Sequence, residues 1–234
     1  GVGAFCPTLY PSAPSEMLKK LKDFSSIIGK EKGARIIGFH LEGPFLSPKK
    51  PGVMKPSDIK EIDISLIEKL YKAANGKIVS LTAAPELKNF SKLAAWARKN
   101  KVILQLGHTN ATYEDMQKAF SFGAKHITHL FLAMSPLHHR ELGAAGAALI
   151  NKDFSVELLA DGCHIKPEVL RLVFALKDIK KIILITDSLT PCSKKSGLAN
   201  GEEDLLKNGV FVRKRDGVIA GPALTMAQGL KNLI

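Results

Sequence analysis

Two neighbouring stretches decide the fold: Gln105-Leu-Gly-His-Thr-Asn-Ala-Thr112 and Lys125-His-Ile-Thr-His-Leu-Phe-Leu-Ala-Met134. Each contains a short aliphatic run typical of a buried strand, and the residues between them have the apolar spacing of a helix. His108 and His129 lie at the ends of the two predicted strands, 21 positions apart. Parallel strands joined by a helix end at the same edge of a sheet, so the two imidazoles should converge. This convergence predicts a metal site.

The composition fits a large folded domain. The chain has 234 residues, and 45% of them are hydrophobic, enough for a sizeable core. Cys6, Cys163 and Cys192 are odd in number and scattered, which argues against a disulfide framework and favours a cytoplasmic location. Because no apolar run approaches the roughly 20 residues of a membrane span, we expect no membrane association.

The formal net charge of +12 comes mainly from lysines distributed over predicted helix faces. Such a surface favours anionic ligands in general. The sequence has no basic stripe interleaved with aromatic residues and no nucleic-acid recognition motif, so we expect a small anionic partner and no nucleic acid. Steeply salt-sensitive binding to DNA or RNA would contradict this expectation.

Predicted strands and helices alternate seven times along the chain, which indicates a parallel α/β sheet covered on both faces. The predicted strands span residues 1–9, 35–43, 77–86, 102–106, 125–129, 155–164 and 181–187. A doubly wound sheet and a (β/α)₈ TIM-type barrel both fit this alternation. Residue types suited to catalysis end five strands: Glu42, His108, His129, His164 and Asp187. A barrel gathers all strand ends around one mouth, so we favour a barrel that lacks its first strand.

After Ser188 the sequence becomes polar. Asn208-Gly209 and Asp216-Gly217 are strong hairpin signals, so we expect a β-hairpin insertion at 194–222 before a final helix within 221–234. Apart from this insertion, residues 1–234 are predicted to form one catalytic barrel domain.

Glu42, His108 and His129 offer one carboxylate and two imidazoles, a donor set suited to Zn²⁺ or another borderline divalent ion. Such an ion lowers the pKa of bound water to about 7 and polarises a carbonyl. Hydrolysis also needs a group that accepts and returns a proton, and Asp187 is the candidate. A lone strand histidine is more often a core residue than a ligand. Because all these residues lie at strand ends, we interpret the histidines as ligands.

Other polar residues have secondary roles in this hypothesis. His164 could hydrogen-bond substrate or a developing oxyanion, and Arg140 with the backbone of Phe131–Met134 could hold an anion such as phosphate. Two further residues receive structural interpretations. Glu86 is interpreted either as a strand-end polar residue near the mouth or, with a slight preference, as a helix-start acid. His126, three residues before His129, is predicted to face away from it.

Several motifs together resemble the N-acetylglucosamine-6-phosphate deacetylase family of the amidohydrolase superfamily. The matching stretches are Phe39-His-Leu-Glu-Gly-Pro-Phe45, Ala84-Pro-Glu86, Leu106-Gly-His-Thr-Asn-Ala-Thr112, Thr128-His-Leu-Phe131, Ala133-Met134, Ala160-Asp-Gly162 with His164, Ile185-Thr-Asp187 and Ala223-Leu-Thr-Met226. The resemblance implies a barrel enzyme with one divalent metal ion, Zn or alternatively Fe, Mn or Co. It implies that the enzyme removes acetate from a sugar phosphate. N-acetylgalactosamine 6-phosphate is the rival substrate, and a non-catalytic sugar-phosphate-binding barrel is the rival function.

The resemblance also assigns roles by position. It implies that Glu42, His108 and His129 bind the metal and that Asp187 is the catalytic acid and base. His164 and Arg140 match positions that contact substrate, the arginine across a homodimer interface, and Ala133 matches a backbone contact to the phosphate. These assignments stay expectations at this point.

Two residues depart from the family pattern. Leu132 replaces the usual asparagine beside the phosphate position, and Met54 replaces a usual histidine. We also expect the His-x-His first strand and the small β-domain of the family to lie outside these 234 residues. Both departures concern the sugar phosphate more than the metal.

Overall fold

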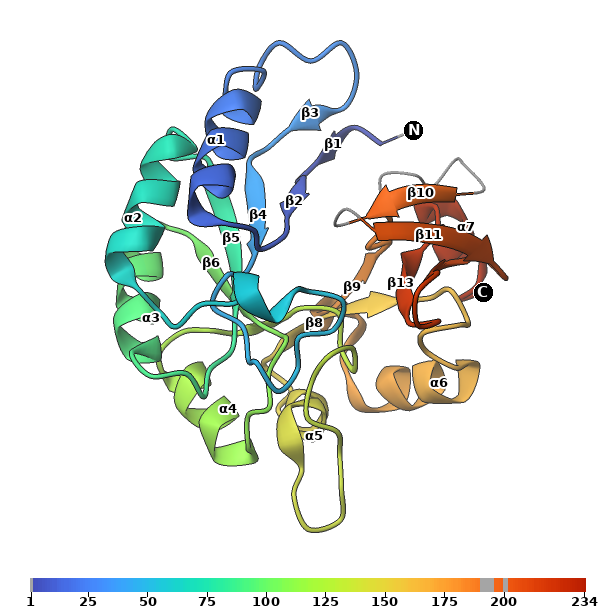
Figure 1. Ribbon diagram of the computed structural model, residues 1–234. Coiled ribbons are helices and arrows are strands. Elements are labelled where there is room, and N and C mark those ends of the chain that lie inside the picture. Colours follow the sequence, from blue (N-terminus) through green and yellow to red (C-terminus); the bar gives the residue numbers. More distant parts are fainter. Residues whose placement is uncertain (1, 190–195, 200–201) are drawn as a thin grey trace.

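A computed structural model describes residues 2–189, 196–199 and 202–234. Within this part of the chain, one sheet contains seven parallel strands whose spatial order follows the sequence. They are β2 (Thr8–Leu9), β4 (Phe39–Glu42), β5 (Ile78–Ala83), β6 (Ile103–Leu106), β7 (His126–Ile127), β8 (Ser155–Leu159) and β9 (Ile182–Ile185). The sheet curls into an open barrel wall with helices on its outer side (Figure 1). The predicted parallel barrel architecture is confirmed.

In the described part of the chain, six helices connect the strands of this sheet, and two of them begin at a capping side chain. They are α1 (Pro14–Ser25), α2 (Ile64–Ala73), α3 (Phe90–Lys99), α4 (Tyr113–Ser121), α5 (Gly143–Ile150) and α6 (Pro167–Leu176), with short 3-10 turns η1 (Pro56–Asp58) and η2 (Ile179–Lys181). Thr112 and Asp115 form a capping box at the start of α4. Asp63 accepts hydrogen bonds from the amides of Ser65 and Leu66 and so fixes the start of α2. No helix in these ranges combines the length and apolar character needed to cross a membrane.

The first predicted strand is divided into two pieces. Residues Ala4–Phe5 form β1, which pairs with β3 (Arg35–Ile36) in a separate small sheet, whereas β2 pairs with β4. Two features separate the pieces: Pro7 has no N–H for a ladder, and Gly38 has a φ of 151° that ordinary residues rarely adopt. The strand that leads to the predicted metal site therefore begins at Thr8.

A four-stranded antiparallel sheet follows β9. It contains β10 (Ser196–Ala199), β11 (Glu202–Lys207), β12 (Val210–Arg213) and β13 (Ile219–Pro222). Both predicted hairpin turns are present, and Asn208 and Gly209 have the positive φ values of 50° and 82° that a tight hairpin requires. Helix α7 (Met226–Lys231) packs on β9 and lies within the predicted range, after β13, which ends at Pro222. Positions 194–195 and 200–201 of the predicted insertion, and Cys192, lie outside the described residues.

The apolar core lies between the sheet and its helices, and the concave inner face of the sheet is polar. Leu41, Leu81 and Leu104 are buried in the core cluster together with helical residues such as Leu70 and Leu93. Alternate strand positions face the other way, where Thr82, Gln105 and Thr128 hydrogen-bond to one another across three strands. The polar residues are therefore collected inside the curl, below its mouth.

Candidate metal centre

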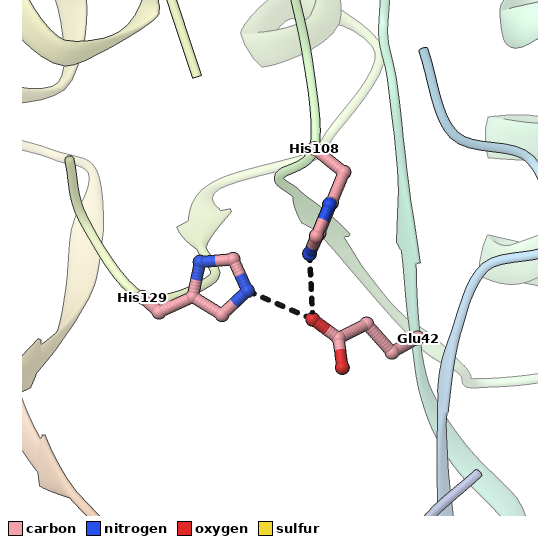
Figure 2. A group of neighbouring side chains, drawn as sticks. All are labelled: Glu42, His108 and His129. Carbon is pink, nitrogen blue, oxygen red and sulfur yellow. Dashed lines mark hydrogen bonds and ion pairs between the residues drawn. The ribbon is translucent and has the colours of Figure 1, made fainter. Parts of the chain in front are cut away.

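Glu42, His108 and His129 meet at the mouth of the curled sheet. Glu42 ends β4, and the two histidines lie two residues beyond the ends of β6 and β7. All three residues are buried, and one donor atom from each lies within 4.8 Å of the others. Figure 2 shows both imidazoles directed at the Glu42 carboxylate.

The hydrogen-bonding geometry fits a bound cation. The Nε2 atoms of His108 and His129 lie 2.9 and 2.8 Å from the same oxygen, Oε1 of Glu42. The other ring nitrogen of His108, Nδ1, lies 3.1 Å from the carbonyl oxygen of Lys50. A neutral imidazole has a single N–H and cannot donate to acceptors on both sides. With Nδ1–H donated to Lys50, Nε2 is free for a metal ion, the usual arrangement of a metal-binding histidine.

Strained backbone positions direct these side chains into the mouth. His108 and His129 have φ values of 47° and 28°, in the left-handed region that non-glycine residues rarely adopt. Neighbouring peptide groups hold the chain there: the Ser47 N–H donates to the His108 carbonyl at 2.8 Å, and the Thr109 N–H donates to Ala133 at 3.0 Å. The surrounding loops thus fix a conformation that the two residues would not favour alone.

Glu86 braces the same loop. Its carboxylate accepts hydrogen bonds from the Thr109 hydroxyl and, at 2.7 Å, from the Asn110 N–H, directly after His108. It does not lie in the first turn of α3, which contains no acidic residue. The interpretation of Glu86 as a helix-start acid is therefore wrong. Pro85, directly before Glu86, could have predicted that Glu86 lies in a loop.

Glu42 and His129 form a buried ion pair. Burial alone would raise the pKa of Glu42, but hydrogen bonds from His108 and His129 outweigh it and hold this pKa well below its usual value. Burial alone would lower the pKa of His129, whereas its hydrogen bond to Glu42 and the charge of Glu42 raise it to about 9. His129 is therefore the charged partner of Glu42 in this buried pair.

Asp187 follows β9 by two residues and has a φ of 48°. Burial, reinforced by the charge of Glu42, raises its pKa to about 7, while His129 and His164 act in the opposite direction. Asp187 is therefore a carboxyl group close to Glu42 and His129 that exchanges a proton near neutral pH.

His164 lies in the loop after β8 and is held by Asp161. The His164 Nδ1 atom is 2.5 Å from Asp161 Oδ2, and Asp161 Oδ1 also accepts the N–H groups of Cys163 and His164 at 3.0 and 2.9 Å. This arrangement leaves Nε2 of His164 available to another partner. Asp161 belongs to a motif quoted above and lies three residues before His164, a spacing from which this contact could have been predicted.

The remaining predicted substrate positions are separated from one another. Ala133, with a φ of 47°, lies in the turn after His129, and the Leu132 N–H donates to the His129 carbonyl at 3.0 Å. Arg140 is exposed in the loop that leads to α5, and no contact between it and the three metal residues occurs in the described part of the chain. The structure therefore brings Ala133 and Leu132 close to His129 in the chain and leaves Arg140 at the surface.

Tyr10 is a residue at the mouth that sequence reasoning missed. The register of β2 on β4 pairs Thr8 with His40 and Leu9 with Leu41, so Tyr10 comes next, beside Glu42. Burial and the charges of Glu42 and Asp187 raise the pKa of Tyr10 well above its usual value, so the phenol stays a hydrogen-bond donor. A strand-end position was the only signal available.

The sequence model described as the amidohydrolase family matches residues 12–234. The chain belongs to the amidohydrolase family. N-acetylglucosamine-6-phosphate deacetylase of Bacillus subtilis (strain 168) is 39% identical over 206 residues, covering 86% of this chain and 51% of that protein. N-acetylgalactosamine-6-phosphate deacetylase of Escherichia coli O157:H7 is 30% identical over 237 residues, covering 100% of this chain and 62% of that protein.

Solved amidohydrolase-family structures share the fold. A mutant N-acetyl-D-glucosamine-6-phosphate deacetylase from Mycobacterium smegmatis, in complex with N-acetyl-D-glucosamine-6-phosphate, matches with a TM-score of 0.92 and 28% identity, over 98% of this chain and 60% of that one. The Thermotoga maritima deacetylase matches with a TM-score of 0.89 and 32% identity, over 99% and 63%. This amidohydrolase chain spans between about half and two thirds of the length of the relatives it matches.

Proposed function

We propose that this chain carries the metal centre of an N-acetyl amino-sugar 6-phosphate deacetylase, which hydrolyses N-acetylglucosamine 6-phosphate to glucosamine 6-phosphate and acetate. The observation that carries the proposal is the convergence of Glu42, His108 and His129 on one buried point, with the buried Asp187 just beyond the end of β9. The likeness to the deacetylases compared above, over 86% and 98% of this chain, supports the same reaction class.

The three converging residues would hold one divalent metal ion. A donor set of two imidazoles and one carboxylate suits Zn²⁺, with Fe, Mn and Co as rivals. When bound, such an ion supplies Lewis acidity, which polarises an amide carbonyl and makes water acidic enough to react near neutral pH. The lysine carbonyl behind His108 and the loop brace from Glu86 keep its ring oriented for that role.

The chain's own residues carry out the proton transfers. Asp187 accepts a proton from the attacking water and returns it to the amine nitrogen as the C–N bond breaks, so that acetate and a free amine leave. The Nε2 side of His164, oriented by Asp161, hydrogen-bonds the substrate carbonyl or the oxyanion that develops there. The raised pKa of Asp187 suits a group that gives and takes a proton in one reaction cycle.

Recognition of the phosphate is proposed to use the turn after His129 and a second protomer. The backbone around Leu132 and Ala133 offers peptide groups to the phosphate, while Leu132 supplies no side-chain amide. Arg140, exposed on its loop, is proposed to reach the substrate of the partner in a homodimer. A cytoplasmic location is proposed as well, consistent with Cys6 and Cys163 both being free thiols.

Acetate release tests the function. Purified chain is stripped with a chelator, reloaded with Zn²⁺ or Co²⁺, and assayed with N-acetylglucosamine 6-phosphate. We expect acetate only from the reloaded protein. Activity lost after treatment with the chelator should return when the metal is added back. Tight sugar-phosphate binding without acetate release would replace the enzyme with the rival hypothesis of a non-catalytic binding barrel.

The E. coli relative favours a second candidate substrate, N-acetylgalactosamine 6-phosphate. The two sugars differ only in the orientation of one hydroxyl group, so the same chemistry serves both. The ratio of kcat/KM for the two sugars, measured in parallel, decides between them. A higher value for the galacto sugar would reassign the substrate and leave the metal centre intact.

A further inference from the structure

A hydrogen-bonded polar layer lies inside the curled sheet, on the same face as Glu42. His40 contacts Thr8 through Nδ1 at 3.1 Å and Thr82 through Nε2 at 2.8 Å. Thr82 lies 2.7 Å from Thr128, and both hydroxyls reach the Gln105 side-chain oxygen. The layer crosses the sheet from β2 to β7 and continues to β8.

Glu157 is the last member of this layer and occupies the middle of β8. Its Oε1 accepts hydrogen bonds from His126 Nε2 at 3.2 Å and Gln105 Nε2 at 3.4 Å, and its Oε2 accepts the backbone N–H of His129 at 3.2 Å. The side chain is only 14% exposed. All three partners are donors, so a side chain with two acceptor oxygens is the one that satisfies them.

The backbone of Glu157 contacts the same loop. Its carbonyl oxygen accepts the N–H of Leu130 at 2.9 Å. The peptide N–H groups of His129 and of the residue after it are therefore both bound by Glu157, one through the side chain and one through the main chain. Strand β7 ends at Ile127, so no regular ladder holds this part of the chain.

We propose that Glu157 is a positioning residue for the metal ligand His129. Glu157 binds the peptide groups on either side of the His129 Cα. It thereby fixes the left-handed backbone that directs the His129 imidazole at Glu42. Glu157 does not touch the metal or the substrate and acts only through His129. The inference rests on the proposed metal centre, and it assigns a role to a carboxylate that the proposed reaction does not use.

Glu157→Gln tests this role with little change in shape. The amide must turn its NH₂ group toward a donor, so the hydrogen bond from His129 or those from His126 and Gln105 are lost. Thr82→Val is the matched control, because it removes hydrogen bonds of the same buried layer without contacting Glu157 or His129. Both variants should lose stability, and only Glu157→Gln should change the metal centre.

Three measurements on the full chain separate positioning from general stabilisation. We expect Co²⁺ binding to weaken about 10- to 100-fold in Glu157→Gln, as for other residues that orient metal ligands. In Thr82→Val it should stay within about twofold. The visible spectrum of bound Co²⁺ should shift only in Glu157→Gln. In the metal-free chain, hydrogen exchange at the His129 amide should accelerate in Glu157→Gln and not in Thr82→Val.

The outcomes distinguish this inference from the proposed function. Unchanged Co²⁺ affinity and spectrum in Glu157→Gln, or equal losses in both variants, would overturn the positioning role. A wild-type chain that binds no Co²⁺ would contradict the metal centre itself. In that case the His129 amide exchange still decides whether Glu157 holds the loop.

Discussion

Gly52 packs so closely against the ring of His108 that a side chain at position 52 would press on the ring. A Cβ atom built on residue 52 would lie 3.0 Å from Cε1 of His108, and the glycine has a φ of 58°. The carbonyl that fixes His108 Nδ1 belongs to Lys50, two residues earlier in the same loop. The loop of residues 50–52 thus sets both the orientation and the clearance of one proposed metal ligand.

Gly52→Ala should therefore weaken metal binding. We expect at least about a tenfold loss of Co²⁺ affinity. The His108 ring must shift, and its hydrogen bond to the Lys50 carbonyl oxygen is disturbed. The left-handed backbone adds about 1 kcal/mol of instability. Gly29→Ala is the control: its φ is 84°, and nothing lies within 4 Å of the added Cβ. Equal metal affinities in the two variants would contradict the steric explanation.

Asp187→Asn should separate chemistry from metal binding. The amide cannot accept and return a proton, so turnover should fall about 100- to 10,000-fold. Metal affinity should change little, since Asp187 is not among the three converging donors. Acetate release and Co²⁺ titration are measured on the same preparation. Turnover equal to wild type would disprove the acid–base role.

Metal binding should release a proton from His129. In the metal-free chain its pKa is about 9, so below that pH the imidazole is protonated and must lose a proton before Nε2 can bind an ion. Apparent affinity should therefore rise with pH, by about tenfold per unit from this group, and level off above about pH 9. Calorimetry in buffers of different ionisation enthalpy measures the released proton. Heats independent of the buffer would contradict the assignment.

Lys177 should contribute a pH dependence to stability. Its side chain donates to the carbonyls of Ala148 and Asn151 at the end of α5, and burial, with the charge of Lys181 adding to it, lowers its pKa to about 8. The unfolded lysine has a pKa near 10.4. The unfolded chain thus binds more protons between these values, and the folded state gains stability as pH rises through this window.

The measurement compares wild type with Lys177→Met by urea unfolding at pH 7 and pH 10. Contributions of other groups cancel in the difference between the two proteins. Wild type should gain about 2 to 3 kcal/mol relative to the variant over this interval. A difference that is constant with pH would show that the amine titrates normally. Lys152→Met, at an exposed position, supplies the baseline.

Sequence alone predicted the parts of the site that depend on strand order. Parallel strands joined by helices must end at one edge, so Glu42, His108 and His129 could be grouped without coordinates. The prediction for His126 was wrong. It faces the interior and contacts Glu157, because β7 stops at Ile127 and the irregular chain beyond it changes the alternation on which the prediction relied.

Contacts between distant residues account for what sequence could not predict. Glu86 and Glu157 act on loops 24 and 28 positions away, and neither carboxylate has a local motif that names its partner. The small-residue run Gly143–Ile150 forms α5. Its composition alone cannot distinguish a buried helix from a buried strand. The positive φ values at His108 and His129 could not be predicted either, because only a small minority of histidines adopt this conformation.

The left-handed backbone at His108, His129 and Asp187 sets a limit on engineering this chain. Each of these positions stores about 1 to 3 kcal/mol of conformational strain that glycine would largely relieve. Selection for heat resistance alone would then reward variants that discard the two imidazoles and the carboxyl group. A library screened for thermal tolerance must include a metal-retention step, or it will enrich inert barrels.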